Sequence, residues 1–270
     1  MLGPGSESTM ILGVHGVLGL KPWIRRAYED EELEEDTFSL VVKRTMAYGW
    51  SSFHAGGPET GRWGHNDAGG DWSQDGRVRQ LAWLQVDVPG DPRGQRLPVL
   101  PAATVLGDVL HRVGRFQLTG LHTLAPMDLA VDSRADLANA ADWFSLAEQA
   151  EQGGESGEFT LSVLGTEKAD LPGRAAGILA SALDRTYGCM TIEASPADDG
   201  TARAGLSLPL AGELQTEGLR HGPAFRCGVR EWSLDVAAWA TEVFIDAVRE
   251  SGPTGPVLLT VSKMSRPAAA

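Results

Sequence analysis

The clearest alternation of hydrophobic and polar positions lies in the second half of the chain, after a polar segment at 151–158. Short apolar runs typical of strands alternate there with stretches whose apolar residues recur every three or four positions, as on one helix face. Helix ends are marked by Asp170 with Pro172, by Gly188, and by Ser233. The expected order is strand, helix, strand, strand, helix, strand, over 159–164, 170–187, 189–194, 204–209, 233–251 and 257–261. This order predicts a split βαβ, or ferredoxin-like, arrangement.

The first half has a less regular pattern. Its strands are expected at 11–20, 37–46, 78–88 and 116–124, and its helices at 104–113 and 133–150. The pattern predicts an α+β protein with two ferredoxin-like or related α/β sandwich halves. The first, N-terminal half covers 1–150, and the second, a βαββαβ half, covers 151–270. The sequence shows no aligned internal repeat that would establish a duplication.

A polar, glycine-rich loop from Tyr48 to Gly76 separates two of these segments. Loops of this length without structure of their own are usually functional or disordered, and disordered segments seldom hold so many aromatic residues. Tryptophan offers a large contact area and one N–H donor, which suits a recognition surface. The alternative is that the tryptophans pin the loop onto the body of the protein. The candidate ligand- or partner-binding residues are Trp50, Arg62, Trp63, His65, Asp67, Asp71 and Trp72.

The net charge of −13 narrows the range of partners. The run EDEELEED at 29–36 supplies seven of the negative charges, and such a run is more often a solvated loop than a docking site for a basic partner. Clustered Lys and Arg, which phosphate neutralisation needs, are missing. The expected partner is therefore a protein or a small molecule, and the charge argues against nucleic acid.

Two cysteines, Cys189 and Cys227, are too few for a zinc site built on thiolates, and Cys189 is expected to be a buried, inert thiol. No run of 18 apolar residues and no leader-like amino terminus occurs, so a cytoplasmic protein that does not enter the membrane is expected. No serine elbow and no phosphate-binding glycine loop follow a strand. Hydrolase and nucleotide-binding functions therefore have no support.

A metal site is the sharpest chemical alternative. His65 and Asp67, with the distant His221, supply the two imidazoles and one carboxylate of the facial triad in non-haem Fe(II) oxygenases. Their spacing, with Arg226 or Arg230 shortly afterwards to anchor a 2-oxoglutarate carboxylate, resembles the taurine dioxygenase-like group. That family places the distal histidine after jelly-roll strands, whereas helical patterns flank His221 here.

A second resemblance rests on HGPAF at 221–225, which is similar to the Tyr-Gly-Pro-x-Phe element of polyketide dehydratases. The segment 97–129 is loosely similar to the one after the catalytic histidine in that family. The resemblance implies a double hot-dog cleft in which a histidine faces an aspartate. The stretch WLQVDVPGDPRGQR at 83–96, just before Leu97, holds no histidine, so the catalytic pair of that family is incomplete. Gly222 and Pro223 are interpreted as a turn.

These observations lead to one main functional hypothesis and one alternative. The main hypothesis is a soluble cytosolic accessory or binding subunit that recognises a partner or ligand through the loop 48–76. The alternative is an Fe(II)- and 2-oxoglutarate-dependent oxygenase with His65, Asp67 and His221 as ligands and Arg230 as the cosubstrate anchor. The sequence does not decide whether the protein is an enzyme.

Overall fold

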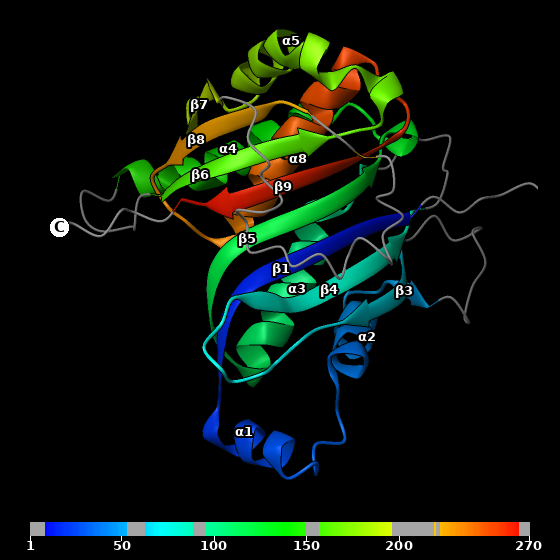
Figure 1. Cartoon of the computed structure of the whole chain (residues 1–270), viewed down its shortest axis with the longest axis vertical. Helices are drawn as coiled ribbons and strands as arrows, with labels where there is room; N and C mark the ends of the chain where they lie inside the picture. The colour runs from blue at the N-terminus through cyan, green and yellow to red at the C-terminus, as the bar shows by residue number, and fades with distance from the viewer. Residues whose placement is uncertain are drawn as a thin grey trace, which may run out of the picture.

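A computed structural model describes residues 9–52, 63–88, 96–149, 157–195, 219 and 222–264. The chain forms one mixed α/β body around a nine-stranded sheet with the order β2-β3-β4-β1-β5-β9-β6-β8-β7 (Figure 1). All neighbouring strands are antiparallel except β2 and β3. The strands are β1 (Thr9–Leu20), β2 (Ser51–Ser52), β3 (Gly64–Gly69), β4 (Arg79–Asp87), β5 (Gly114–Pro126), β6 (Gly157–Leu164), β7 (Met190–Ser195), β8 (Ala224–Val229) and β9 (Pro256–Lys263).

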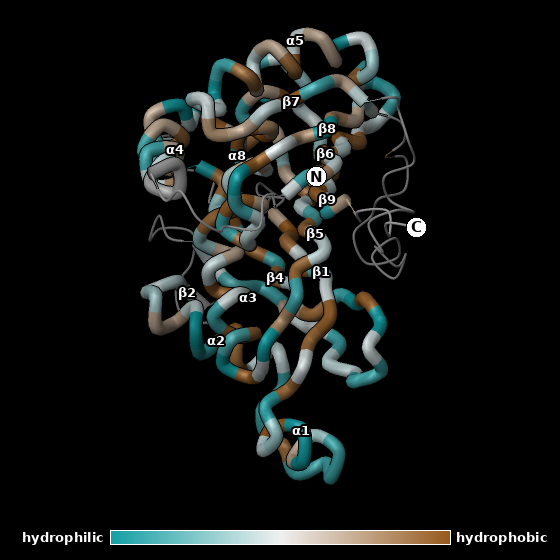
Figure 2. The backbone as a smooth tube through the Cα atoms, turned by 90° about the vertical axis from the view of Figure 1, so that its left-hand side faces the viewer, coloured by the Kyte–Doolittle hydropathy of each residue, from teal (hydrophilic) through white to brown (hydrophobic). Residues whose placement is uncertain are grey.

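The α-helices of the described residues gather on one face and at the ends of this sheet (Figures 1 and 2). They are α1 (Pro22–Glu29), α2 (Thr37–Ala47), α3 (Val99–Val113), α4 (Arg134–Gln149), α5 (Leu171–Asp184) and α8 (Leu234–Ser251). None of them is long and apolar enough to cross a membrane. Short 3-10 turns follow β5 and β6, at Met127–Leu129 and Glu167–Ala169.

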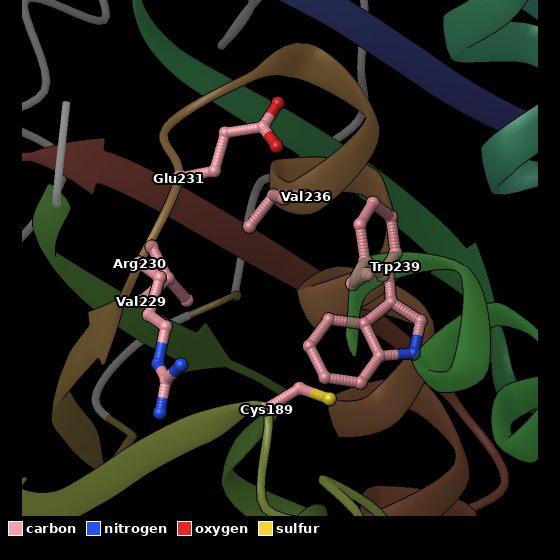
Figure 3. A pocket seen from close by; sticks show the side chains of 7 residues that line it. Cys189, Val229, Arg230, Glu231, Val236 and Trp239 are labelled. Carbon is pink, nitrogen blue, oxygen red and sulfur yellow. The ribbon is translucent and has the colours of Figure 1, made fainter. Parts of the chain in front are cut away.

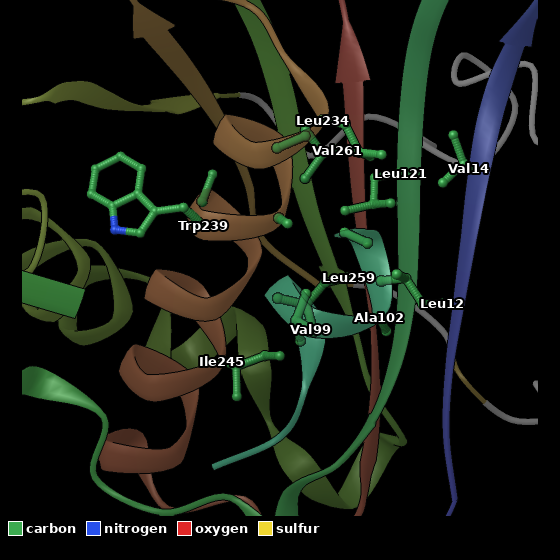
Figure 4. Packing of buried hydrophobic residues seen from close by; sticks show 14 of the residues in the cluster. Leu12, Val14, Val99, Ala102, Leu121, Leu234, Trp239, Ile245, Leu259 and Val261 are labelled. Atoms are coloured by element: carbon green, nitrogen blue, oxygen red, sulfur yellow. The ribbon is translucent and has the colours of Figure 1, made fainter. Parts of the chain in front are cut away.

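The core lies between the sheet and the two long helices α3 and α8. Figure 4 shows Leu12, Leu121 and Leu259, from three neighbouring strands, on the side of the sheet that these helices cover. The helices pack against each other at Gly107, where an added Cβ would lie 3.1 Å from Leu234 Cδ2. An alanine at this position would require the Leu234 side chain to shift slightly, so the glycine leaves room for this close contact between the helices.

Most of the predicted elements are present, and the mixed α/β class is confirmed. The described C-terminal elements run in the order β6, α5, β7, β8, α8, β9; β8 was not predicted, and the strand predicted at 204–209 lies outside the described residues. The pairing of β5 with β9 joins the elements of 1–150 and 151–270 into one continuous sheet. The described strands of the two halves therefore do not form separate sheets.

The prediction of a strand at 37–46 is wrong, because this segment forms the helix α2. The side chain of Asp36 accepts a hydrogen bond from the Ser39 backbone, and the Ser39 hydroxyl accepts one from the Asp36 backbone. This reciprocal capping box stabilises the first turn of a helix. The β-branched residues that suggested a strand lie on a helix whose buried positions are Thr37, Val41 and Thr45.

Three further local details differ from the predictions. The interpretation of Gly222 and Pro223 as a turn directly into the last helix missed β8, which lies between them and α8. Asp170 precedes α5 in a left-handed conformation, with φ of 46°, and its side chain makes no capping hydrogen bond. Gly188 has a positive φ of 82°, but α5 already ends at Asp184.

Candidate functional site

The tryptophans of the loop 48–76 pack onto the body of the protein where the structure describes them. Trp72 is only 3% exposed and donates its indole N–H to the backbone oxygen of Leu81 at 3.1 Å. Trp50 and Trp63 are half-buried and meet edge to face, with ring centroids 5.6 Å apart. Arg62 lies outside the described residues. The described rings therefore fit the pinning alternative better than a displayed aromatic platform.

The proposed metal ligands face different surroundings. His65 is buried in β3 with its Nδ1 2.9 Å from the hydroxyl of Thr45, and burial lowers the pKa of its imidazole. Asp67 is exposed, and its carboxylate accepts a hydrogen bond from the Ala68 backbone. A bulge between these two positions interrupts the alternation of β3. The third proposed ligand, His221, lies outside the described residues, and within the described part no three metal-binding side chains gather.

The remaining predicted residues have ordinary structural partners or surface positions. Asp71 accepts hydrogen bonds from the Ser73 backbone at 2.9 Å and from Arg79 at 2.6 Å, which fixes the start of β4. Arg230 is exposed at the end of β8. It lines a small cavity of ≈ 20 Å³ together with Cys189 and Trp239 (Figure 3). Such a volume holds about one water molecule, so it is not a site for an organic ligand.

A much larger cavity, of ≈ 560 Å³, lies between α3, the start of α8 and the ends of β5 and β9. Its volume falls in the range of about 300 to 1,000 Å³ that is typical of small-molecule sites. One part of its wall is apolar, with Phe116, Leu118 and Trp232. The polar part carries the ionisable side chains Asp108, His111, Asp235 and Lys263.

Asp108 is held in the wall of this cavity by the helix α2. Its carboxylate accepts hydrogen bonds from Arg44 Nε at 2.8 Å and from the Tyr48 hydroxyl at 2.7 Å. Burial by itself would raise the pKa of this carboxyl, but the hydrogen bonds from Tyr48 and Arg44 bring the pKa below its usual value. Asp108 therefore provides a fixed negative charge.

Asp235 has the opposite electrostatic environment. Its carboxyl remains accessible at the start of α8, yet partial desolvation raises its pKa, and the negative charges of Glu231 and Asp108 raise it further. His111 opposes this shift. An aspartate that is protonated more readily than usual and lies in a cleft is a candidate functional residue.

His111 supplies a nitrogenous group in the same cavity. Its Nδ1 lies 2.8 Å from the backbone oxygen of Gly107, one helical turn earlier. Because a carbonyl oxygen only accepts, this geometry assigns the Nδ1 proton to that bond and leaves Nε2 as an acceptor when the ring is neutral. The cavity thus combines a carboxyl with a raised pKa and an imidazole whose Nε2 is an acceptor when the ring is neutral.

Sequence reasoning missed this site because its members come from four separate segments. Asp235 stands two residues after Ser233, which was correctly identified as a helix start. His111 lies in the last turn of α3, at an exposed position that no sequence motif marks as part of a site. Comparisons with known protein families, with curated proteins and with solved structures gave no match for this chain.

Proposed function

We propose that the protein binds a small amphipathic molecule in the cavity between α3 and α8. The observation that carries this proposal is the ≈ 560 Å³ cavity with an apolar wall and Asp235 on its polar wall. The apolar part of the ligand packs against Phe116, Leu118 and Trp232, where it removes nonpolar surface from water. The polar head binds Asp235. This keeps the hypothesis of a binding protein and moves its site away from the loop 48–76.

The preferred head group is positively charged or donates hydrogen bonds. Glu231 and Asp108 both raise the pKa of Asp235, which means that the potential at its carboxyl is negative. A second anion would add to this repulsion, whereas a cation relieves it and favours the charged carboxylate. Binding of a cation is therefore coupled to proton release from Asp235 and becomes stronger as the pH rises through the raised pKa of this group.

The test uses hexylamine and hexanoate, two probes with the same apolar chain and opposite charges. We expect hexylamine to bind more tightly, and Asp235→Asn to weaken its binding about tenfold, a change of about 1.4 kcal/mol. Isothermal titration calorimetry in two buffers of different ionisation enthalpy measures affinity and proton release together. Glu231→Gln is the comparison variant: it removes a neighbouring exposed charge and leaves Asp235 in place, so it should weaken hexylamine binding less than Asp235→Asn does. Tighter binding of hexanoate, or unchanged affinity of Asp235→Asn, would show that the proposal is wrong.

A second candidate function is acid–base catalysis, which the pairing of Asp235 with His111 in one cavity favours. A carboxyl with a raised pKa donates a proton, and the His111 Nε2 accepts one. Polyketide dehydratases, whose Tyr-Gly-Pro-x-Phe element is similar to HGPAF at 221–225, use a residue pair of this type. Here the histidine, His111, lies on α3 and not in the stretch just before Leu97. The reaction would be the removal of water from a 3-hydroxyacyl thioester.

For this candidate we expect Asp235→Asn and His111→Gln each to lower the rate about 10²- to 10⁴-fold, the usual contribution of a general acid or base. The assay follows formation of the unsaturated product from a 3-hydroxyacyl N-acetylcysteamine thioester. Gln117→Ala, which changes another wall residue of the same cavity without an ionisable group, serves as the control. Absence of turnover in the wild-type protein would rule out dehydration and leave ligand binding as the proposed function.

The other hypotheses from the sequence remain predictions. Recognition of a partner through the loop 48–76 now depends on its half-buried Trp50 and Trp63 and on Arg62, because Trp72 belongs to the core. The Fe(II)- and 2-oxoglutarate-dependent oxygenase requires His65 to turn away from Thr45 and to meet Asp67 and His221. The ferredoxin-like description of the two halves and the cytoplasmic location also keep this status.

A further inference from the structure

Four polar side chains from neighbouring strands lie together on the face of the sheet that α3 and α8 do not cover. Gln80 of β4 is paired with His15 of β1, and His122 of β5 is paired with Thr260 of β9. Their neighbours along the strands, including Val14 and Leu121, point toward the helices (Figure 4). Because successive side chains of a strand alternate between the two faces, His15, His122 and Thr260 lie on the opposite face. A bulge between Val14 and His15 interrupts the alternation in the pairing with β4, and the amide of Gln80 reaches the same face beside Gly13.

Each of these side chains has a buried polar atom without a hydrogen-bond partner. The atoms are His15 Nδ1, His122 Nε2, Gln80 Nε2 and Thr260 Oγ1. Both histidines and Thr260 are at most 1% exposed. An isolated unsatisfied atom costs about 1 to 3 kcal/mol, and buried polar atoms in folded proteins are nearly always paired. Four such atoms on adjoining strands therefore indicate a partner that is not part of the described chain.

Gly13 allows two of these atoms to converge. A Cβ on Gly13 would lie 2.0 Å from His122 Cε1, 2.7 Å from His122 Nε2 and 2.8 Å from Gln80 Nε2. No side chain fits at this position, so the backbone of β1 leaves the space to the imidazole and the amide. The glycine thus has a specific role in assembling the polar cluster.

The hydrogen bond between the two imidazoles determines what the cluster offers. His15 Nε2 lies 2.7 Å from His122 Nδ1, so one ring donates this bond and the other accepts it. Burial lowers the pKa of His15 to about 4, and burial together with His15 lowers that of His122, so both rings are neutral at neutral pH. In either tautomer, one outer nitrogen is a donor and the other an acceptor. Gln80 and Thr260 also offer both functions, and none of the four groups carries a charge.

We propose that His15, His122, Gln80 and Thr260 form a second binding site, for an uncharged polar group that both donates and accepts hydrogen bonds, such as an amide. A charged ligand would have no counter-charge among these four groups, and its desolvation would oppose binding. The site lies on the opposite face of the sheet from the cavity with Asp235. It is therefore independent of the function proposed for that cavity.

The test uses acetamide, acetate and methylammonium, three small probes that differ in charge. In protein labelled with ¹⁵N at histidine, we expect acetamide to shift the His122 Nε2 and His15 Nδ1 resonances in a saturable way. Acetate and methylammonium should bind at least about tenfold more weakly. If acetamide leaves both nitrogens unchanged, the proposal is wrong and internal water is the partner of the cluster. If either ion binds as tightly as acetamide, the assignment to an uncharged group is wrong.

Two glycine variants test whether the acetamide-induced shift of the histidine resonances comes from binding at this cluster. Gly13→Ala displaces the His122 ring and should abolish the acetamide shift, whereas Gly19→Ala on the same strand should retain it, because a Cβ there meets only Arg115 O at 3.8 Å. Equal acetamide titrations in the two variants would place the probe elsewhere and overturn the proposal. If Gly13→Ala does not fold, the comparison of the three probes on the wild-type protein still decides the question.

Discussion

Replacing Asp246 with alanine is expected to lower the free energy of unfolding by about 3 to 5 kcal/mol, because it removes the buried counter-ion of a buried arginine. Asp246 of α8 is 0% exposed and Arg185, just after α5, is 1% exposed. The Arg185 Nε donates a hydrogen bond to Asp246 Oδ2. The other carboxylate oxygen accepts a bond from Arg249 Nε at 2.8 Å. This ion pair joins α5 to α8 inside the protein, where water cannot replace the lost partner.

The matched control is Glu250→Ala, because Glu250 binds the same arginine from an exposed position. Its Oε2 accepts a hydrogen bond from Arg185 Nη2 at 2.9 Å, and its side chain is 47% exposed. We expect a loss of at most about 1 kcal/mol, as for other exposed ion pairs. Urea denaturation of both variants measures the difference. Similar small losses for the two would mean that Asp246 is hydrated and not held in a dry ion pair.

Between pH 7 and pH 5, protonation of His15 and of Glu242 is expected to change the free energy of unfolding in opposite directions. The pKa of His15 falls from 6.5 in the unfolded chain to about 4 in the folded protein, so the unfolded state binds its proton first as the pH decreases. Between pH 7 and pH 5 this lowers the free energy of unfolding by about 2 kcal/mol. His122 acts in the same direction, because its pKa is also lowered.

Glu242 acts in the opposite direction. Its carboxyl, buried between α8 and the start of α3, accepts a hydrogen bond from the Leu100 backbone at 3.0 Å, and burial raises its pKa from 4.5 to about 7. The folded state therefore takes up this proton first, which raises the free energy of unfolding by about 2 kcal/mol between pH 7 and pH 5. The contributions of His15 and Glu242 nearly cancel in the wild-type protein.

The variant Glu242→Gln removes one contribution and keeps an oxygen for the Leu100 backbone. Its stability should fall by about 2 kcal/mol or more from pH 7 to pH 5, whereas a double variant with His15→Gln and His122→Gln should gain about 2 kcal/mol. Chemical denaturation at the two pH values measures both slopes. A pH dependence of Glu242→Gln equal to that of the wild-type protein would contradict the assignment of a raised pKa to Glu242.

The sequence predicted elements well where one pattern dominated. The apolar faces of α3 and α8 recur with helical spacing, and Ser233 caps α8 by accepting a hydrogen bond from the Val236 backbone. The segment 37–46 was misassigned because its β-branched residues favour a strand, whereas the capping box at Asp36 favours a helix. The β-branched residues and the capping box favour different structures for the same segment. The structure shows the helix, which packs against α3 and β3.

The candidate sites could be predicted only in part. His65 and Trp72 drew attention because the sequence pattern predicted a glycine-rich loop at 48–76, but His65 lies in β3 and both side chains are buried. The cavity with Asp235 and His111 depends on the approach of α3 to α8, and Asp108 in its wall is held by Arg44 from a segment 64 residues away. No local pattern in the sequence encodes these distances.

The sequence by itself determined the mixed α/β class, the location of most helices and strands, and the buried faces of the two long helices. These properties depend on short-range periodicity and on capping residues, which act within a few positions of the chain. Only the tertiary structure decided that β5 and β9 join both halves into one sheet, that His15 meets His122, and that Asp235 faces a cavity. Side chains far apart in sequence acquire these contacts, and the shifted pKa values that result from them, only when burial brings them together and removes water.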